Sequence, residues 1–411
     1  MYRHAGVIRR ILAWLMVCAL WPAFAGAQSV PDVPDPEIVH MRLGPFWIKP
    51  TLALTDAGID TNVFNRAESA APERDFTLTL SPAARLWMGL GPTWISGRVT
   101  EDLVWYKKFS SQRSANSSYN LGWAVPLSRM TITVAGNWAR TRERPGFEID
   151  ERADRSERVY TGAVELRVMS KMFIGARAER RQVDFKEAEA FLGRNLHDEL
   201  NRTQTVEAVT LRHDLTPLTS LTFDVSRIED RFEFTSLRDA DSTQMAVGVA
   251  FTPDALISGS AKMGYRNFTP LESDLPEFQG GTAAVNLTYV ARGATRFALQ
   301  VTRDVQFSFD VNQPYYLLTG VTGSVSQQIF GPVDVEVRLA RQRLSYRERQ
   351  GVTVEAPTRV DHVRGVGVGI GYHVREDLRV AFNVDQQKRA SEIENRSFSG
   401  LRYGTAVTYG F

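Results

Sequence analysis

The stretch LRYGTAVTYGF, residues 401–411, ends the chain on an apolar alternation. Tyr403, Val407, Tyr409 and Phe411 share one parity, and mostly small or polar residues separate them. A period of two residues is typical of a β-strand with one apolar face. A soluble protein can end on such an edge strand, but a long apolar edge favours aggregation. The rest of the sequence has to distinguish a soluble edge from a strand that faces lipid.

The same alternation recurs along the whole chain. In VDVEVRLARQRL (residues 333–344), Val and Leu side chains share one face, and acidic and basic side chains share the other. LRVAFNVDQQKR (residues 378–389) repeats this pattern, whereas helical periodicity is almost absent. The sequence therefore predicts an all-β fold. The alternating segments that we count begin near residues 46, 75, 93, 114, 130, 158, 173, 202, 220, 241, 257, 280, 296, 313, 333, 358, 378 and 398.

The connections between these eighteen segments alternate in length. If the first strand runs outward, the even-numbered connections are short, and prolines such as Pro92, Pro126 and Pro332 fall in them. The odd-numbered connections include long polar stretches such as ERPGFEIDERADRSE, residues 143–157. Short turns at one end and long loops at the other are typical of outer-membrane barrels. An even strand count also brings both ends of the barrel to the periplasmic side.

Two features favour a transmembrane barrel over a β-sandwich or a soluble barrel. Many segments have ten or more residues, against about five or six for a typical soluble strand and about nine to eleven for a tilted bilayer-crossing strand. Aromatic residues gather near the predicted strand ends, for example Trp47, Trp87 and Trp94 at the periplasmic end and Phe268 and Tyr315 at the outer end. Such clusters are expected to form two aromatic girdles in lipid.

We therefore predict an up-and-down antiparallel transmembrane β-barrel of the outer-membrane type. It has about eighteen strands, or sixteen if one long strand has been counted as two. The barrel is expected to be a single domain over residues 45–411, preceded by a flexible periplasmic segment over residues 28–44. That segment begins with the Pro- and Asp-rich stretch SVPDVPDPEIVH.

The first 27 residues have the pattern of a secretory signal peptide. Basic residues precede an apolar run over residues 11–19, and Ala25-Gly26-Ala27 precedes the expected cleavage site. The run is shorter than the roughly 20 residues that a transmembrane helix needs. The only cysteine, Cys18, leaves with the signal, so we expect no disulfide in the mature chain. The remaining net charge is about −1, which does not indicate a nucleic-acid partner.

The last strand resembles the C-terminal signal that the barrel assembly machinery reads. That signal has a polar residue, a glycine and alternating hydrophobic residues up to a final aromatic, which here correspond to Arg402, Gly404, Val407, Tyr409 and Phe411. The resemblance implies localisation in the bacterial outer membrane. It makes the assembly machinery and outer-membrane lipid expected partners.

Two stretches near the start carry a family resemblance. IKPTLALTDAGIDTNVFN (residues 48–65) ends in an Asp-x-Asn-hydrophobic-Phe turn, and RDFTLTLSPAARLWM (residues 74–88) has the form Asp-apolar-x-apolar-x-Pro. Both are similar to the opening strands of the β-barrel porin 2 family, which is associated with exopolysaccharide export gene clusters. The resemblance implies a passive export channel with a polysaccharide ligand. Its partners would be periplasmic polysaccharide export and copolymerase proteins.

The predicted strand number also bears on function, because sixteen to eighteen strands leave an aqueous channel. Arginine accounts for most of the cations, and its guanidinium suits acidic or neutral glycans. Opposite charges could instead pair across strands and stiffen the wall. An alternating strip of Gly365, Gly367, Gly369 and Gly371 could widen the lumen, admit a ligand or bend the wall. The predicted pore-lining residues are Asp224, Lys262, Arg266, Asn286, Arg296, Gln300, Asp334, Glu336, Arg338, Arg379, Asn383 and Arg402.

The sequence offers little support for catalysis. His213-Asp214 and Asp361-His362 are adjacent on strands, and such neighbours point to opposite faces. Nucleophile-elbow and HExxH patterns do not occur. We expect no catalytic residue, metal or cofactor. The alternatives to exopolysaccharide export are a general or substrate-specific diffusion porin for small solutes and, third, an outer-membrane lipase or deacylase.

Overall fold

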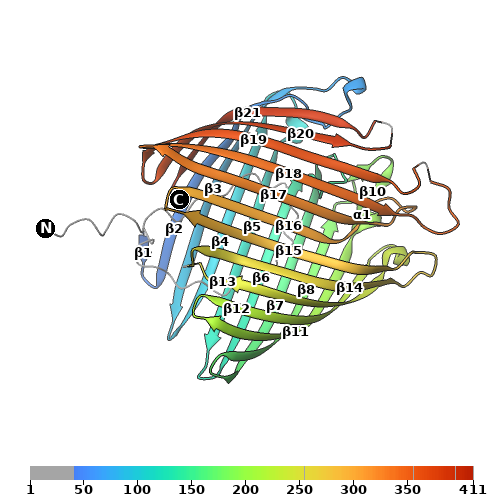
Figure 1. Cartoon of the computed structure of the whole chain (residues 1–411). Helices are drawn as coiled ribbons and strands as arrows, with labels where there is room; N and C mark the ends of the chain where they lie inside the picture. Colours follow the sequence, from blue (N-terminus) through green and yellow to red (C-terminus); the bar gives the residue numbers. More distant parts are fainter. Residues whose placement is uncertain (1–40, 254, 355, 394, 411) are drawn as a thin grey trace.

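One closed antiparallel sheet dominates the molecule (Figure 1). The computed structural model describes residues 41–410 except 254, 355 and 394. Within this part of the chain, eighteen strands form the barrel wall, which confirms the predicted fold. The wall strands are β2 (Phe46–Asp60), β3 (Asp75–Leu90), β4 (Thr93–Tyr106), β5 (Ser114–Pro126), β6 (Met130–Glu143), β7 (Ala153–Met169), β8 (Met172–Phe185), β11 (Arg202–Thr216), β12 (Thr219–Phe232), β13 (Ala240–Phe251), β14 (Ile257–Pro270), β15 (Phe278–Ala291), β16 (Thr295–Phe307), β17 (Tyr315–Phe330), β18 (Val333–Arg347), β19 (Val360–Arg375), β20 (Leu378–Ala390) and β21 (Phe398–Tyr409).

The observed strand starts agree with the alternation in the sequence. Each strand begins within two residues of its predicted start, except β7, which begins at Ala153 rather than near residue 158. Residues 154–157 are polar on both faces, so they lack the apolar alternation, yet they still pair with the end of β6. The structure describes only residues 41–44 of the segment predicted to be flexible, and the predicted signal peptide lies outside the described residues. Met41–Leu43 forms a short strand, β1, that pairs with the start of β2.

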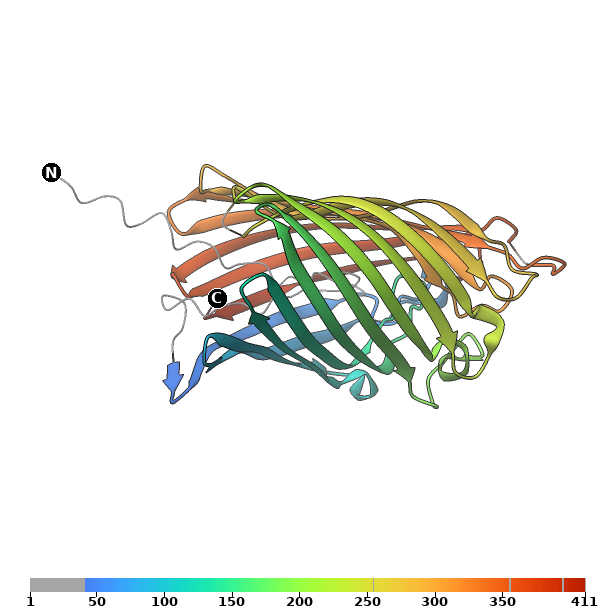
Figure 2. The ribbon, with the colours of Figure 1, turned by 90° about the horizontal axis from the view of Figure 1, so that it is seen from below.

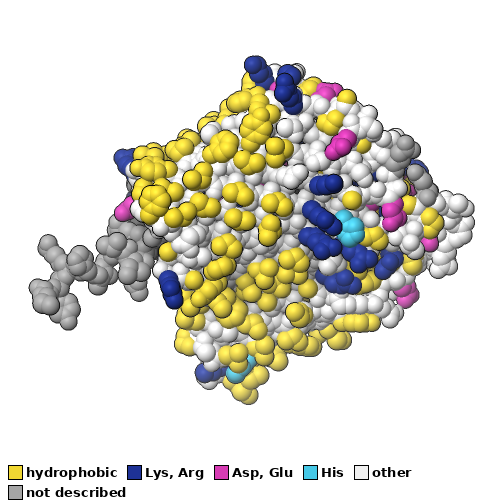
Figure 3. Space-filling model, turned by 45° about the horizontal axis from the view of Figure 1, so that its top comes forward, with side chains coloured by type: hydrophobic (Ala, Val, Ile, Leu, Met, Phe, Trp, Pro, Cys, Tyr) yellow, Lys and Arg dark blue, Asp and Glu magenta, His cyan; other side chains and the backbone are white. Residues whose placement is uncertain are grey.

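The outer face of the wall is apolar. On β19, Val366, Val368 and Ile370 are each about half exposed, whereas the glycines between them are buried on the inner face. Figure 3 shows hydrophobic side chains over much of the flank of the barrel. Closure of the sheet satisfies the backbone hydrogen bonds of every strand, as a lipid environment requires. No helix in the described residues is long and apolar enough to cross a membrane.

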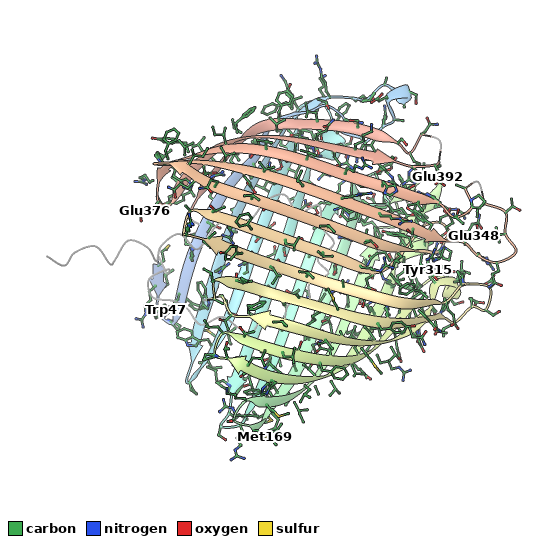
Figure 4. The ribbon with its side chains drawn as sticks, in the orientation of Figure 1. Trp47, Met169, Tyr315, Glu348, Glu376 and Glu392 are labelled. Carbon is green, nitrogen blue, oxygen red and sulfur yellow. The ribbon has the colours of Figure 1, made fainter. Side chains whose placement is uncertain are left out.

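The two ends of the barrel differ. The even-numbered connections are tight turns, and the odd-numbered ones carry the longer loops (Figure 2). In Figure 4, Trp47 and Glu376 mark the end with the turns, and Tyr315, Glu348 and Glu392 mark the end with the loops. We call these the periplasmic and the extracellular end, following the outer-membrane pattern.

The girdle prediction is wrong for several aromatic residues. Trp87 is only 4% exposed, and Trp47 packs edge-on against Trp94 at 5.6 Å between ring centroids, all on the inner face. At the extracellular end, Phe268 and Tyr315 are each 1% exposed and belong to one buried cluster. These residues lie at strand ends as predicted. The parity of the three tryptophans and of Phe268 turns them towards the lumen, whereas Tyr315 shares the outward parity of Val321 and is buried by its contact with Phe268, at 4.9 Å between ring centroids. The inward residues are therefore available to fill the interior rather than to contact lipid headgroups.

The family motif near the start forms the seam of the barrel. β2 and β21 pair there, with Asp60 opposite Arg402. The Asp60 carboxylate accepts a hydrogen bond from the Asn62 backbone N–H at 2.9 Å and another from Arg402 Nε at 2.8 Å. The Asn62 side chain donates to the Ser399 carbonyl oxygen at 3.0 Å. A Cβ on Gly404 would lie 2.8 Å from the Ala57 carbonyl oxygen, so this position needs glycine for the two strands to meet.

Of the predicted assembly signal, Arg402, Gly404, Val407 and Tyr409 lie on β21. Tyr409 is 46% exposed on the outer face, whereas Arg402 is engaged with Asp60 at the seam. Phe411 lies outside the described residues. Recognition by the assembly machinery stays a prediction.

Candidate functional site: the lumen and its constriction

The structure places all the predicted pore-lining residues on the parity that faces the lumen. Most of the charged ones are held in ion pairs that reach over an intervening strand. Arg338 on β18 bonds Asp385 on β20 at 2.9 Å, and Arg379 on β20 bonds Asp334 on β18 at 2.9 Å. Both pairs cross β19. The predicted residues are Asp224, Lys262, Arg266, Asn286, Arg296, Gln300, Asp334, Glu336, Arg338, Arg379, Asn383 and Arg402.

The glycine strip on β19 explains how these pairs can form. A Cβ on Gly367 would overlap the Asp385 carboxylate, and a Cβ on Gly371 would overlap the guanidinium of Arg379. Glycine therefore leaves the groove in which side chains from β18 and β20 meet. The glycine strip therefore makes room for ion pairs between strands of the wall. Such pairing is the second of the two roles that the sequence suggested for the charged residues.

Substitution of this strip is expected to destabilise the barrel. Gly371→Ala should displace the Arg379–Asp334 pair and lower the free energy of unfolding by about 1–3 kcal/mol. The measurement is the temperature at which the folded barrel loses its fast mobility in SDS gels. Gly162→Ala is the matched control, because a Cβ on Gly162 meets no atom within 4 Å. Equal melting of both variants would contradict this role of the strip.

A loop from one side of the wall enters the extracellular half of the lumen. This constriction loop, residues 144–152, connects β6 to β7. It contacts Arg389 on β20, Arg396 in the β20–β21 connection, and Ser308 and Phe309 in the β16–β17 connection. These partners come from well-separated parts of the wall, so the loop lies across the lumen rather than along its rim.

Two apolar side chains in the constriction loop account for its position. Burial of each apolar side chain is worth about 1.5–3 kcal/mol. Phe147 packs against a cluster of Tyr316, Leu318, Leu344, Tyr346 and Val363. Ile149, 3% exposed, packs with Ala153, Val183, Phe185, Phe191, Leu196, Leu200 and Phe309.

Arg389 is the main polar anchor of the constriction loop. Its side chain is fully buried, and Nη1 donates to the carbonyl oxygens of Phe147 at 3.2 Å and Glu148 at 3.0 Å. The same nitrogen lies 3.0 Å from the Asp150 carboxylate, and Nη2 bonds the carboxylate of Asp361. One guanidinium thus joins the loop to the inner wall through its fork of donors.

Glu148 carries the loop's second polar link. Its carboxyl accepts a hydrogen bond from Ser308 Oγ at 2.7 Å and a longer one from the Phe309 backbone N–H at 3.3 Å. Burial raises the pKa of the Glu148 carboxyl, while nearby guanidinium groups oppose that rise. The hydrogen bond from Ser308 and the nearby guanidinium groups therefore favour the charged form of this carboxyl.

Other extracellular connections bind the partners of the constriction loop, so that the loops at this end form one connected group. Arg238, in the β12–β13 connection, is buried and donates to the carbonyl oxygens of Ser308 at 2.9 Å and Phe309 at 3.1 Å. It also forms a 2.7 Å ion pair with Glu199 on the short helix α1 (Leu196–Leu200). This helix follows the two-residue strands β9 (Ala190–Phe191) and β10 (Arg194–Asn195). The loops gather at this end of the barrel in Figure 2.

A cavity of about 70 Å³ lies between the constriction loop and the wall strands β7, β8, β11, β16 and β17. Its charged lining consists of the guanidinium groups of Arg155, Arg181 and Arg202 and the carboxyl groups of Glu148 and Glu157. Cations thus exceed anions by one at this point.

A second cationic feature lies near the periplasmic end. Lys49, Arg85 and Arg98 stand opposite one another on β2, β3 and β4, with their side chains on the inner face. We call these three residues the basic ladder. Lys49 and Arg85 form no ion pair with any described residue. Like charges directly opposite one another on a sheet are destabilising, so this row is a candidate site for a passing anion.

Comparison with known proteins agrees with this architecture. The family model described as putative beta-barrel porin 2 matches residues 35–411. The chain belongs to this family. The family and the fold together make it an outer-membrane β-barrel porin. No curated protein sequence matches this porin.

Solved structures similar to this porin include outer-membrane proteins of low sequence identity. OccAB4 of Acinetobacter baumannii is 9% identical, with a TM-score of 0.47 over 91% of this chain and 99% of that one. OpdK of Pseudomonas aeruginosa, solved with vanillate, is 11% identical, with a TM-score of 0.46 over 88% and 98%. OccK2 of the same organism, in complex with glucuronate, is 10% identical, with a TM-score of 0.46 over 88% and 97%.

The sequence prediction missed the constriction of this porin. The loop was identified only as a long polar connection, yet Phe147 and Ile149 alternate with acids inside it, which is the signal that it is buried. Lys49 and Arg85 could have been found by parity, because both lie two residues from inward tryptophans. The pair Asp361-His362 divides as predicted: Asp361 is buried on the inner face, and His362 lies on the outer one.

Proposed function

We propose that this porin is a selective diffusion channel for small anionic hydrophilic solutes. The observation that carries the proposal is the combination of a loop-filled lumen with the basic ladder below it, in which Lys49 and Arg85 form no ion pair with a described residue. The loop is expected to limit the size of what can pass, because Phe147 and Ile149 pack against the wall inside the barrel. The basic ladder and the three guanidinium groups beside the constriction favour negative charge, since a charged lining raises the local concentration of counter-ions.

The ladder gives a direct test of ion selectivity. The double variant Lys49→Gln/Arg85→Gln should shift the reversal potential in a KCl gradient towards cation preference, because it removes two fixed positive charges from the lumen. Single channels of the purified chain in planar bilayers provide the measurement. Arg140→Gln is the control, since Arg140 lies on the outer face and is 65% exposed. An unchanged reversal potential in the double variant would remove the ladder from the proposal.

Export of exopolysaccharide is the second candidate. It is supported by the family resemblance and by the construction of the constriction from loops, which could move without opening the wall. The motif that carries the resemblance serves the barrel seam through Asp60 and Asn62, so it bears on folding rather than on cargo. An export channel would work with periplasmic export and copolymerase proteins.

Deletion of the gene separates the two candidates. Loss of one surface glycan with an intact envelope, and with its sugars retained inside the cell, would favour export. Unchanged glycan with slower uptake of small organic acids would favour the diffusion channel. An outer-membrane lipase or deacylase, the third candidate, has less support, because the two His–Asp pairs on the wall, His213-Asp214 and Asp361-His362, are each divided between its faces.

A further inference from the structure

Five basic side chains gather on the outer face of the wall near the extracellular end. They are Arg341 and Arg343 on β18, His362 and Arg364 on β19, and Lys388 on β20. We call them the basic patch. The Arg and Lys side chains are exposed, and His362 is partly so. Figure 3 shows Lys and Arg side chains grouped around a histidine beside the hydrophobic surface of the flank.

The strand register sets these like charges against one another. Arg341 is paired with Arg364, Arg364 with Lys388, and Arg343 with His362. None of these side chains forms an ion pair with another residue in the described part of the chain. Like charges directly opposite one another destabilise a sheet, so the free protein carries an electrostatic cost at this place.

Two other outward-facing arginines near the extracellular end are paired with acids. Arg158 on β7 pairs with Asp184 on β8 at 3.3 Å. Arg231 on β12 pairs with Asp241 on β13 at 2.6 Å. Both pairs join outward-facing side chains near the extracellular strand ends. These outward cations are compensated by acids, whereas none of the five side chains in the basic patch is compensated by a described residue.

The patch also lies at the edge of the apolar surface. The next outward positions towards the periplasm are Leu339 on β18 and Val366 on β19, which are 55% and 50% exposed. A ligand on the patch would thus have its polar part on the cations and its apolar part beside these side chains. A lipid in the outer leaflet has both a polar and an apolar part, whereas a soluble anion would contact only the cations.

We propose that the basic patch binds the phosphate groups of a phosphorylated glycolipid in the outer leaflet of the membrane. Guanidinium groups match phosphate oxygens with two parallel hydrogen bonds. Basic clusters next to a bilayer attract anionic lipids, at about 1 kcal/mol per cation. Two phosphates on one lipid would neutralise several of these opposed cations at once. The site is on the outside of the barrel, so it is independent of which solute crosses the lumen.

Native mass spectrometry of the full chain in a neutral detergent tests the proposal. The probes are lipopolysaccharide with both lipid phosphates and the same lipid after removal of its phosphates. The variant is Arg341→Gln/Arg364→Gln/Lys388→Gln. We expect it to bind the phosphorylated lipid about a hundredfold more weakly than the unmodified chain. The dephosphorylated lipid should bind both proteins with the same low affinity.

Arg158→Gln/Arg227→Gln/Arg231→Gln is the matched control, because it removes three outward cations that are already paired with acids. It should retain the lipid. Heat-dependent gel mobility verifies that each variant is folded, and removal of like charges should leave the basic-patch variant at least as stable as the unmodified chain. Equal lipid binding by the basic-patch variant and the unmodified chain would overturn the proposal. So would full competition by inorganic phosphate at concentrations equal to the lipid, because that identifies a site for the free anion.

Discussion

Replacement of residues 145–151 by a short Gly-Ser linker is expected to raise the single-channel conductance several-fold. These residues are the central part of the constriction loop and include Phe147 and Ile149, which pack inside the barrel. Eighteen strands enclose a channel wide enough to conduct when nothing fills it. Removal of the loop should therefore expose that width, and the larger pore should also lose part of its ion selectivity. Planar-bilayer recordings of the purified chain give both quantities.

Shortening of another extracellular connection provides the control for this deletion. The segment Glu68–Ala71 lies in the β2–β3 connection and is exposed. Its replacement by two glycines should leave the conductance unchanged. If the two loop variants conduct alike, the loop does not limit the channel, and the narrowest point must lie elsewhere in the lumen.

Arg389→Met is expected to release the constriction loop, while Asp361 on the wall loses its bond to Arg389 but keeps Arg359 as a partner at 2.6 Å. The substitution keeps much of the side-chain volume but removes the donors to Phe147, Glu148 and Asp150. Removal of one partner from a buried ion pair costs about 3–5 kcal/mol. The open-channel current should become noisy and larger on average, and a protease that cuts after arginine should gain access to Arg144 or Arg152.

Lys388→Met is the neighbouring control. Lys388 precedes Arg389 in the chain, but its side chain points outwards and is exposed. It should therefore retain quiet currents and resistance of the loop to protease. Quiet currents in Arg389→Met as well would mean that the apolar contacts alone hold the loop, and that Arg389 is dispensable for the constriction.

The strands could be predicted because lipid and lumen impose opposite chemistry on alternate residues. Val366, Val368 and Ile370 show the outer face of β19, and the glycines between them show the inner one. The two-residue period is lost at the extracellular end of β7, where residues 154–157 are polar on both faces, so the predicted start of this strand is five residues late. The two-residue period therefore predicts strands where one face contacts lipid, and it fails where both faces contact water.

The constriction could not be predicted, since it depends on contacts between distant parts of the chain. Glu148 meets Ser308 across 160 residues, and its carbonyl oxygen meets Arg389 across 241. No local pattern specifies these partners. Several aromatic residues at the extracellular strand ends, such as Phe268, were correctly located but assigned to the wrong face, because a membrane girdle and a loop-filled interior both place aromatics there. Phe76 and Trp105 at the same end are exposed on the outer face, as the girdle prediction expects.

Uptake by proteoliposomes that contain the unmodified chain tests the central claim most directly. Three solutes are compared: gluconate, glucose and a linear heptasaccharide. Size restriction by the loop and the excess of lumenal cations predict fast entry of gluconate, slower entry of glucose and exclusion of the heptasaccharide. Entry of the heptasaccharide at the rate of glucose, or equal rates for gluconate and glucose, would contradict a constricted channel that prefers small anions.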